Sequence, residues 1–146
     1  MIAPVQQDGI LRKGKIVFIQ IDASQPQPLF EQVVMQMKFA IAAGTVRVNE
    51  MIPSVRDLAR QLAVNPNTIV RAYRLLQEEE ILVPRRGVGL VVAEHSQAEC
   101  QRQRKAFFQH RFDSFLKEAA GSGLSVEELS EIIRRSSIAT LTPNPK

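Results

Sequence analysis

The sequence has little cysteine, few aromatic residues and no long hydrophobic run. It contains a single cysteine, Cys100, one tyrosine and no tryptophan. A lone cysteine can form neither an internal disulfide nor a zinc-ligand set, which favours a reducing cytoplasm and an inert thiol. No apolar run reaches the ~18 residues that span a bilayer, and the N-terminus lacks the layout of a secretory signal. We therefore expect a soluble, cytoplasmic protein.

Patterns that would indicate an enzyme or a metal site are also absent. His95 and His110 are isolated from each other and from other ligand types, so solvated or structural roles are favoured over metal binding. The stretch "GVGLVV" (87–92) begins like a dinucleotide-binding motif, but the third glycine is missing and the pattern continues as a strand. We expect no catalytic residues, no metal and no cofactor.

What the sequence does contain is enough apolar residues for one core and an excess of basic charge. The chain has 146 residues, 45% of them hydrophobic, and 19 Lys and Arg against 15 Asp and Glu, a formal charge of +4. One main domain is expected at this length. The charge permits a polyanionic partner without establishing one.

The N-terminal part predicts a flexible arm, a strand and a first helix. Residues 1–14 show no period and predict the arm, whereas β-branched and aromatic residues predict a strand over 16–21. Pro28 suits the first position of a helix over 29–43, and Gly44 suits its C-terminal cap. Apolar residues recur in this helix at helical spacing: Leu29, Val33, Met37, Ala40 and Ile41.

Two further helices are separated by a tight turn. Ser54 can cap a short helix over 55–63, with Val55, Leu58, Ala59 and Leu62 turned inward. Asn65 and Pro66 suit the N-cap and first position of a helix that extends to about residue 79. This is the helix-turn-helix layout, in which the second helix enters the major groove by its N-terminal end.

The second of these helices has two distinct faces. At about 100° per residue, the apolar side consists of Ile69, Ala72, Tyr73 and Leu76. The opposite side consists of Asn67, Val70, Arg71 and Arg74, with no acidic residue. Such a side could simply be solvated, but next to a helix-turn-helix turn it favours contact with DNA.

A β-hairpin is predicted after this helix. The stretch "ILVPRRGVGLVVA" (81–93) places two β-type runs around a basic, glycine-bearing tip formed by Arg85, Arg86, Gly87 and Gly89. Such a tip can approach a phosphate chain or enter a minor groove.

Taken together, "PSVRDLA", "NPNT" and "RRGVG" in this order resemble the winged helix-turn-helix domain of the GntR family of bacterial transcription regulators. The stretch "VNPNTIVRAY" and the short C-terminal region are most similar to the YtrA-type subfamily. The resemblance covers residues 16–93 strongly. It implies a mainly α fold with a small β-hairpin wing, in which a winged helix-turn-helix domain (15–94) binds double-stranded DNA. Regulators of this subfamily often repress ABC transporter operons that include their own gene.

The resemblance also implies which residues contact DNA. They are Ser54, Arg56, Asn65, Asn67, Thr68, Arg71, Arg74, Arg85, Arg86 and Gly87. Some have a structural alternative: Ser54 as an N-cap, and Thr68 bonded back to its own helix. Tyr73 is expected to pack, with a hydroxyl that could reach a phosphate. Val70 suits a thymine methyl, or is a filler typical of the subfamily.

Three features depart from the family pattern. Glu80 stands where a glycine usually follows the recognition helix, so the helix either runs on or ends with strain. Val88 replaces a residue that is often basic, and the run "EEE" (78–80) puts negative charge near the wing. We expect weaker wing contacts for this reason.

The C-terminal region (95–138) predicts two helices and a dimer, followed by a tail (139–146). One helix is expected over 97–120, and Ser125 with Glu128 forms a capping box for a second helix that extends to about residue 136. The apolar residues of the two helices are Phe107, Phe108, Phe112, Phe115 and Leu116 in the first and Leu129, Ile132 and Ile133 in the second. Two helices alone cannot bury these side chains, so a homodimer is predicted; folding back onto the first helix is the alternative.

The sequence thus predicts a dimeric DNA-binding repressor with an inverted-repeat operator. The C-terminal region offers no obvious polar pocket, so a small-molecule effector would have to lie between helices or at the domain junction. A protein-interaction module and an RNA-binding module are the alternatives. A regulator fused to an aminotransferase-like domain would need several hundred more residues than this sequence has.

Overall fold

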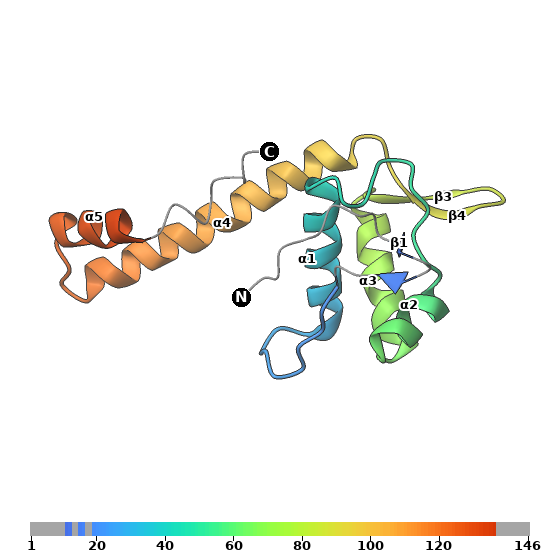
Figure 1. Cartoon of the computed structure of the whole chain (residues 1–146), viewed down its shortest axis with the longest axis horizontal. Helices are drawn as coiled ribbons and strands as arrows, with labels where there is room; N and C mark the ends of the chain where they lie inside the picture. Colours follow the sequence, from blue (N-terminus) through green and yellow to red (C-terminus); the bar gives the residue numbers. More distant parts are fainter. Residues whose placement is uncertain (1–10, 13–14, 17–18, 137–146) are drawn as a thin grey trace. The chain divides into compact units, whose positions relative to one another are not determined.

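The computed structural model describes residues 11–12, 15–16 and 19–136 (Figure 1). Its elements are, in chain order, β1 (Leu11–Arg12), β2 (Lys15–Ile16), α1 (Leu29–Ala42), α2 (Val55–Leu62), α3 (Pro66–Glu78), β3 (Leu82–Arg85), β4 (Gly89–Val92), α4 (Ser96–Gly121) and α5 (Val126–Arg135). They fall into two compact units, Met1–Lys105 and Ala106–Lys146. The predicted class, mainly helical with a small hairpin, is confirmed.

The first unit is built on three helices that share one core. Figure 1 shows α1 and α3 side by side, and Met37 of α1, Leu58 of α2 and Ile69 of α3 are completely buried in the same cluster. All three positions lie on the apolar stripes that the sequence predicted. The helix boundaries agree with the prediction to within one residue at most ends.

The prediction of a strand over residues 16–21 is wrong for residues 19–21. Among the described residues of this segment, Lys15–Ile16 is a strand, paired with Leu11–Arg12, and residues 19–21 belong to no sheet. Here the amide and carbonyl of Gln20 bond to the side chain of Gln36 at 2.8 and 2.7 Å. The buried Gln32 does the same for Asp22, at 3.0 and 2.9 Å. Two glutamines one turn apart on α1 therefore replace a neighbouring strand.

Several sequence predictions fall partly or wholly outside the described residues. Most of the predicted arm (1–14) is in this group, as are residues 17–18 and the predicted tail (139–146).

The predicted hairpin is confirmed as β3 and β4, which form the wing. Leu82 pairs with Val92 at its buried base, and Arg85 pairs with Gly89 at its exposed end. The amide of Val88 donates to the carbonyl of Arg85 at 3.0 Å, which closes the turn. Gly87 at the tip has φ +76°, a conformation that glycine adopts without strain.

The helix α4 begins inside the core of the first unit. The Ser96 hydroxyl donates to the carbonyl of Ile81 at 2.7 Å, and Cys100 is fully buried. Burial raises the pKa of the Cys100 thiol to about 11, so the thiol stays protonated and unreactive at neutral pH. Among the described helices, none has the length and apolar character to cross a bilayer.

In the second unit, the end of α4 is joined to α5 by a tight turn. Ala119 of α4 is buried, and its carbonyl accepts from the Leu124 amide at 3.3 Å. The predicted capping box is confirmed: the Glu128 amide donates to the Ser125 hydroxyl, and the Ser125 amide donates to the Glu128 carboxylate.

The end of α3 contains a glutamate in a left-handed conformation. Glu80 has φ +58°, its amide donates to the carbonyl of Gln77, and the amide of Ile81 donates to the carbonyl of Leu76. This is the Schellman arrangement, in which the position of Glu80 is usually glycine. The helix ends at Glu78, so of the two predicted outcomes the strained end is confirmed.

Glu80→Gly is expected to stabilise the protein. A residue with a Cβ loses roughly 1–2 kcal/mol in this conformation, and the entropy that glycine adds to the unfolded chain offsets part of the gain. The free energy of unfolding should rise by about 0.5–1 kcal/mol in denaturant titrations. Glu78→Gly removes the same charge at a helical position and should lower it by about 1 kcal/mol. A Glu80→Gly variant that is no more stable than the parent would contradict this account.

Candidate nucleic-acid interface

The start of α3 is held by its own cap and presents an uncovered helix end. Asn65 accepts a hydrogen bond from the Asn67 amide at 2.9 Å, and Pro66 is the first helical residue, as predicted. Both Asn65 and Asn67 are exposed. The positive end of the helix dipole therefore faces outward beside the exposed Asn67 side chain, which favours an anion such as a phosphate.

The two faces predicted for α3 are confirmed. The predicted inner residues are all buried: Ile69, Ala72, Tyr73 and Leu76. Asn67, Arg71 and Arg74 on the other side are exposed, and Val70 is 39% exposed. Thr68 is half-buried between the two faces, with its amide bonded to the Asn65 carbonyl. Within the part of the chain that the structure describes, Arg74 has no ion-pair partner.

Arg71 lies against an aromatic ring that the sequence did not bring to notice. Its guanidinium carbon lies 3.8 Å from the centroid of the Phe30 ring, in the first turn of α1. Phe30 is half-buried and packs against the core. The helical spacing of α1 assigned Phe30 no role, because its contact is with a residue 41 positions later in the chain.

The start of α2 combines a capping residue and a free arginine. Ser54 accepts from the Asp57 amide at 3.1 Å, so its structural role as N-cap is confirmed. Arg56 is exposed and has no acidic partner among the described residues. Arg60, one turn later, is bound to Asp57 at 3.0 Å.

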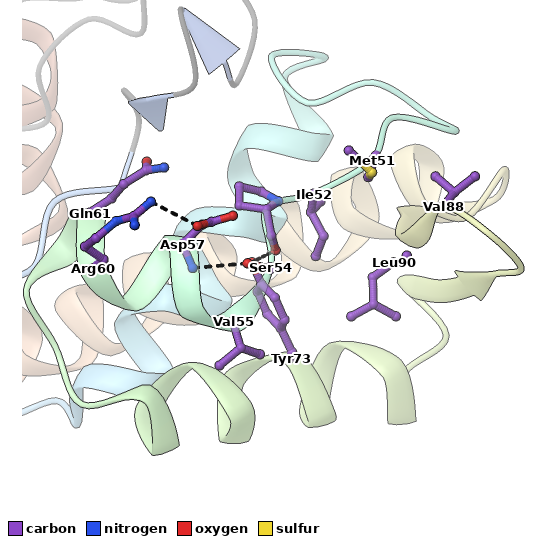
Figure 2. A pocket seen from close by; sticks show the side chains of 12 residues that line it. Met51, Ile52, Ser54, Val55, Asp57, Arg60, Gln61, Tyr73, Val88 and Leu90 are labelled. Atoms are coloured by element: carbon purple, nitrogen blue, oxygen red, sulfur yellow. Dashed lines mark hydrogen bonds and ion pairs between the residues drawn. The ribbon is translucent and has the colours of Figure 1, made fainter.

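Tyr73 packs inside the first unit, as the sequence favoured. Its hydroxyl donates to the carbonyl of Pro53 at 2.8 Å, and burial raises its pKa. The suggested contact of this hydroxyl with phosphate does not agree with its buried position. Instead, Tyr73 ties α3 to the residue that precedes the cap of α2 (Figure 2).

An open cleft of about 640 Å³ separates the start of α2 from the wing (Figure 2). Met51, Val88 and Leu90 give it apolar walls, while Ser54 and Asp57 line the other side. Three hydrogen bonds join polar groups there: from the Asp57 amide to the Ser54 hydroxyl, from Arg60 to Asp57, and from the Tyr73 hydroxyl to the Pro53 carbonyl. No buried side-chain nitrogen or oxygen in the described residues lacks a partner.

One wing arginine is positioned by a residue that the sequence did not indicate. The guanidinium of Arg85 donates to the side chain of Asn49 at 2.8 Å. Asn49 has φ +65°, a conformation that asparagine tolerates, and its amide bonds to the carbonyl of Val92. Arg86 and Gly87 are exposed at the tip, and Val88 beside them is 47% exposed.

The acidic run before the wing is partly neutralised. The carboxylate of Glu79 accepts from the ammonium of Lys38 at 2.6 Å and from the amide of Gln103 at 3.2 Å. Lys38 also donates to Gln103 at 2.8 Å, which links α1, α3 and α4. Glu78 and Glu80 are exposed, and neither has a cationic partner among the described residues.

The second unit exposes most of the apolar residues predicted to form a dimer. Phe108, Phe112 and Phe115 are 44–46% exposed on α4, and Ile132 and Ile133 of α5 are 43% and 41% exposed. The half-buried members of the set are Phe107, Leu116 and Leu129. The rings of Phe112 and Phe115 are stacked with centroids 6.4 Å apart.

Metal coordination finds no support among the residues that the structure describes. No three of their histidine, cysteine, aspartate and glutamate side chains lie close enough together to hold an ion.

Comparison with known proteins points to one family. Residues 29–92 match a model of the family described as bacterial regulatory proteins, gntR family. The HTH-type transcriptional repressor YtrA of Bacillus subtilis is 31% identical over 116 residues, which cover 80% of this chain and 89% of that protein. The uncharacterised regulator YhcF of the same organism is 31% identical over 108 residues, 74% of this chain and 88% of that protein.

Solved structures agree with this assignment. A GntR family transcriptional regulator from Listeria monocytogenes has a TM-score of 0.66 at 29% identity, covering 80% of this chain and 100% of that chain. YtrA from Sulfolobus acidocaldarius, a GntR-family transcription factor, has a TM-score of 0.52 at 28% identity, covering 67% and 99%. The chain therefore belongs to the GntR family, is similar to its YtrA-type members, and is a DNA-binding transcription regulator rather than an enzyme.

Proposed function

We propose that this regulator is a dimeric repressor that reads an inverted-repeat operator with the start of α3. The outer face of α3 carries the proposal: Asn67, Arg71 and Arg74 are exposed opposite a buried apolar side. Amide and guanidinium groups at the N-terminal end of a recognition helix are the donors that reach base edges and phosphates in a major groove.

Other residues flank this helix in roles that fit the DNA backbone. Arg56 follows the cap of α2, where Ser54 has an exposed hydroxyl, and both are suited to one phosphate chain. Arg86 and Gly87 at the wing tip suit the adjacent minor groove. Arg85, which Asn49 holds at the end of β3, and the two side chains at the start of α3, Asn65 and Thr68, complete the proposed contact set.

A homodimer accounts for the apolar surface of the second unit. The exposed rings of Phe108, Phe112 and Phe115 follow one stripe of α4. Burial of apolar surface contributes roughly 25 cal/mol of free energy per Å², so burial of several solvent-exposed phenylalanine side chains favours association by several kcal/mol. A two-fold axis relates the two copies of α3 in such a dimer, and helix-turn-helix dimers of this symmetry read an inverted repeat in successive major grooves.

The regulated genes follow only by analogy with the subfamily. The proposed targets are the protein's own gene and an ABC transporter operon, which this cytoplasmic protein represses by binding their operator. Selection of bound fragments from genomic DNA identifies the operator and its half-site spacing, and it supplies the DNA used in the tests below.

The first test measures binding to this operator duplex over a salt series. Affinity should fall steeply as salt rises, because phosphate contacts release counterions. Arg74→Ala should weaken binding by about tenfold or more and reduce the salt slope by about one phosphate contact. Arg102→Ala is the control, because it removes the same charge from a guanidinium that Glu99 already binds.

Two results would contradict the proposal. Tighter retention of RNA than of duplex DNA would indicate an RNA-binding module, and no retention of the operator even at low salt would indicate a protein-interaction module. Equal losses of operator affinity in Arg74→Ala and Arg102→Ala would contradict DNA binding by the outer face of α3.

A second test addresses the dimer. Phe112→Glu places a charge in the middle of the exposed aromatic stripe and should convert the dimer to a monomer in sedimentation experiments. Operator affinity should fall with it, because two half-sites are then bound independently. His110→Glu adds the same charge on the opposite side of α4 and should leave the dimer intact. A parent protein that is already monomeric at micromolar concentration would refute the proposed assembly.

A third test concerns Val70, the exposed apolar residue on the outer face of α3. If it contacts a thymine methyl, replacing that thymine by deoxyuridine should weaken binding about three- to fivefold, the value of one buried methyl group. The loss should disappear in Val70→Ala and persist in Val88→Ala, which makes the same change at the wing tip. If the parent, Val70→Ala and Val88→Ala lose the same affinity at every thymine replacement, Val70 does not contact a thymine methyl.

A further inference from the structure

Two residues far apart in the sequence form a stacked pair at the edge of the proposed DNA-binding face. Phe30 lies in the first turn of α1, and Arg71 lies in the second turn of α3. The guanidinium carbon of Arg71 is 3.8 Å from the centroid of the ring, which is contact distance. Figure 1 shows these two helices side by side in the first unit.

The two members of this pair differ in mobility. Phe30 is half-buried and packs against the core cluster, so its ring is fixed by neighbouring side chains. Arg71 is exposed, and a long exposed side chain samples many rotamers unless a partner holds it. The ring therefore acts as a platform, and the guanidinium is the group that becomes ordered.

Stacking leaves the hydrogen-bond donors of the guanidinium available. An ion pair takes up N–H groups, as in Arg60 with Asp57 and Arg135 with Glu131. An aromatic face takes up the π surface instead, and the five N–H groups at the edge of the guanidinium stay free for acceptors. Among the described residues, no acid bonds to Arg71.

We propose that Phe30 is a positioning residue for DNA binding, which acts through Arg71 without touching DNA itself. The stack orders the guanidinium before DNA arrives, so less side-chain entropy is lost when it binds a phosphate or a guanine edge. This inference rests on the proposed use of the outer face of α3. It adds a residue of α1 to the determinants of affinity.

The direct test compares two substitutions of the ring. Phe30→Leu keeps an apolar side chain of similar size against the core but has no aromatic face, whereas Phe30→Tyr keeps the face. Phe30→Leu should weaken operator binding about two- to fivefold, the range for an exposed cation–π pair. Phe30→Tyr should bind as tightly as the parent. Thermal melts fix a temperature at which every variant is folded.

A double-mutant cycle separates positioning from general damage to the fold. In an Arg71→Ala background, Phe30→Leu should cause no further loss of affinity, because the group that it positions is gone. Phe39→Leu makes the same change nine residues, or about 13 Å, along α1 and should not weaken binding. The salt slope should drop in Arg71→Ala and stay at the parent value in Phe30→Leu, where the charge is still present.

The outcomes distinguish this inference from the proposed function. Parent-like affinity of Phe30→Leu, or an equal loss from Phe30→Leu with and without Arg71, would overturn the positioning role and leave DNA binding by α3 intact. Failure of the parent protein to bind its operator would instead overturn the proposed function. An equal loss in Phe30→Leu and Phe30→Tyr would show that ring packing, and not the aromatic face, is what matters.

Discussion

Burial of one side of α3 is the constraint on which the rest of the structure depends. Ile69, Ala72 and Leu76 have no exposed surface, so the rotation of α3 about its axis is fixed by the core of the first unit. A helix with one buried stripe has no freedom in what it presents on the other side. Asn67 and Arg74 face outward for this reason, and the hydrogen bond from Tyr73 to Pro53 ties the same helix to the start of α2.

Two groups of arginines in the protein differ in whether an acid neutralises them. Arg60, Arg102, Arg134 and Arg135 are each bonded to an acid three or four residues away on the same helix. The five arginines proposed to contact DNA have no acidic partner among the described residues: Arg56, Arg71, Arg74, Arg85 and Arg86. Two of these five are instead held by uncharged groups, a ring and an amide. Uncharged supports fix a guanidinium in place while leaving its full charge available to a phosphate.

Strain and charge in the turn after α3 show where this chain departs from its family. Glu80 adopts the left-handed conformation that a glycine takes without strain, because the Schellman hydrogen bonds and the burial of Ile81 require the chain to turn there. The neighbouring Glu79 is bound by Lys38 and Gln103, so part of the acidic run also joins α1, α3 and α4. In this turn, the contacts of Glu79 and the burial of Ile81 outweigh the local preference for glycine at position 80.

The helices, their caps and the two faces of α3 could be predicted from the sequence, because apolar spacing and capping residues act over three or four positions of the chain. The same holds for the hairpin and, through three short motifs, for the family. Three features could not be predicted and depend on the folded chain: Gln32 and Gln36 bond to the backbone of Asp22 and Gln20 in place of a strand, Phe30 supports Arg71, and Asn49 holds Arg85. Each of these contacts joins residues at least 10 positions apart, and no local periodicity records which distant side chain will meet which.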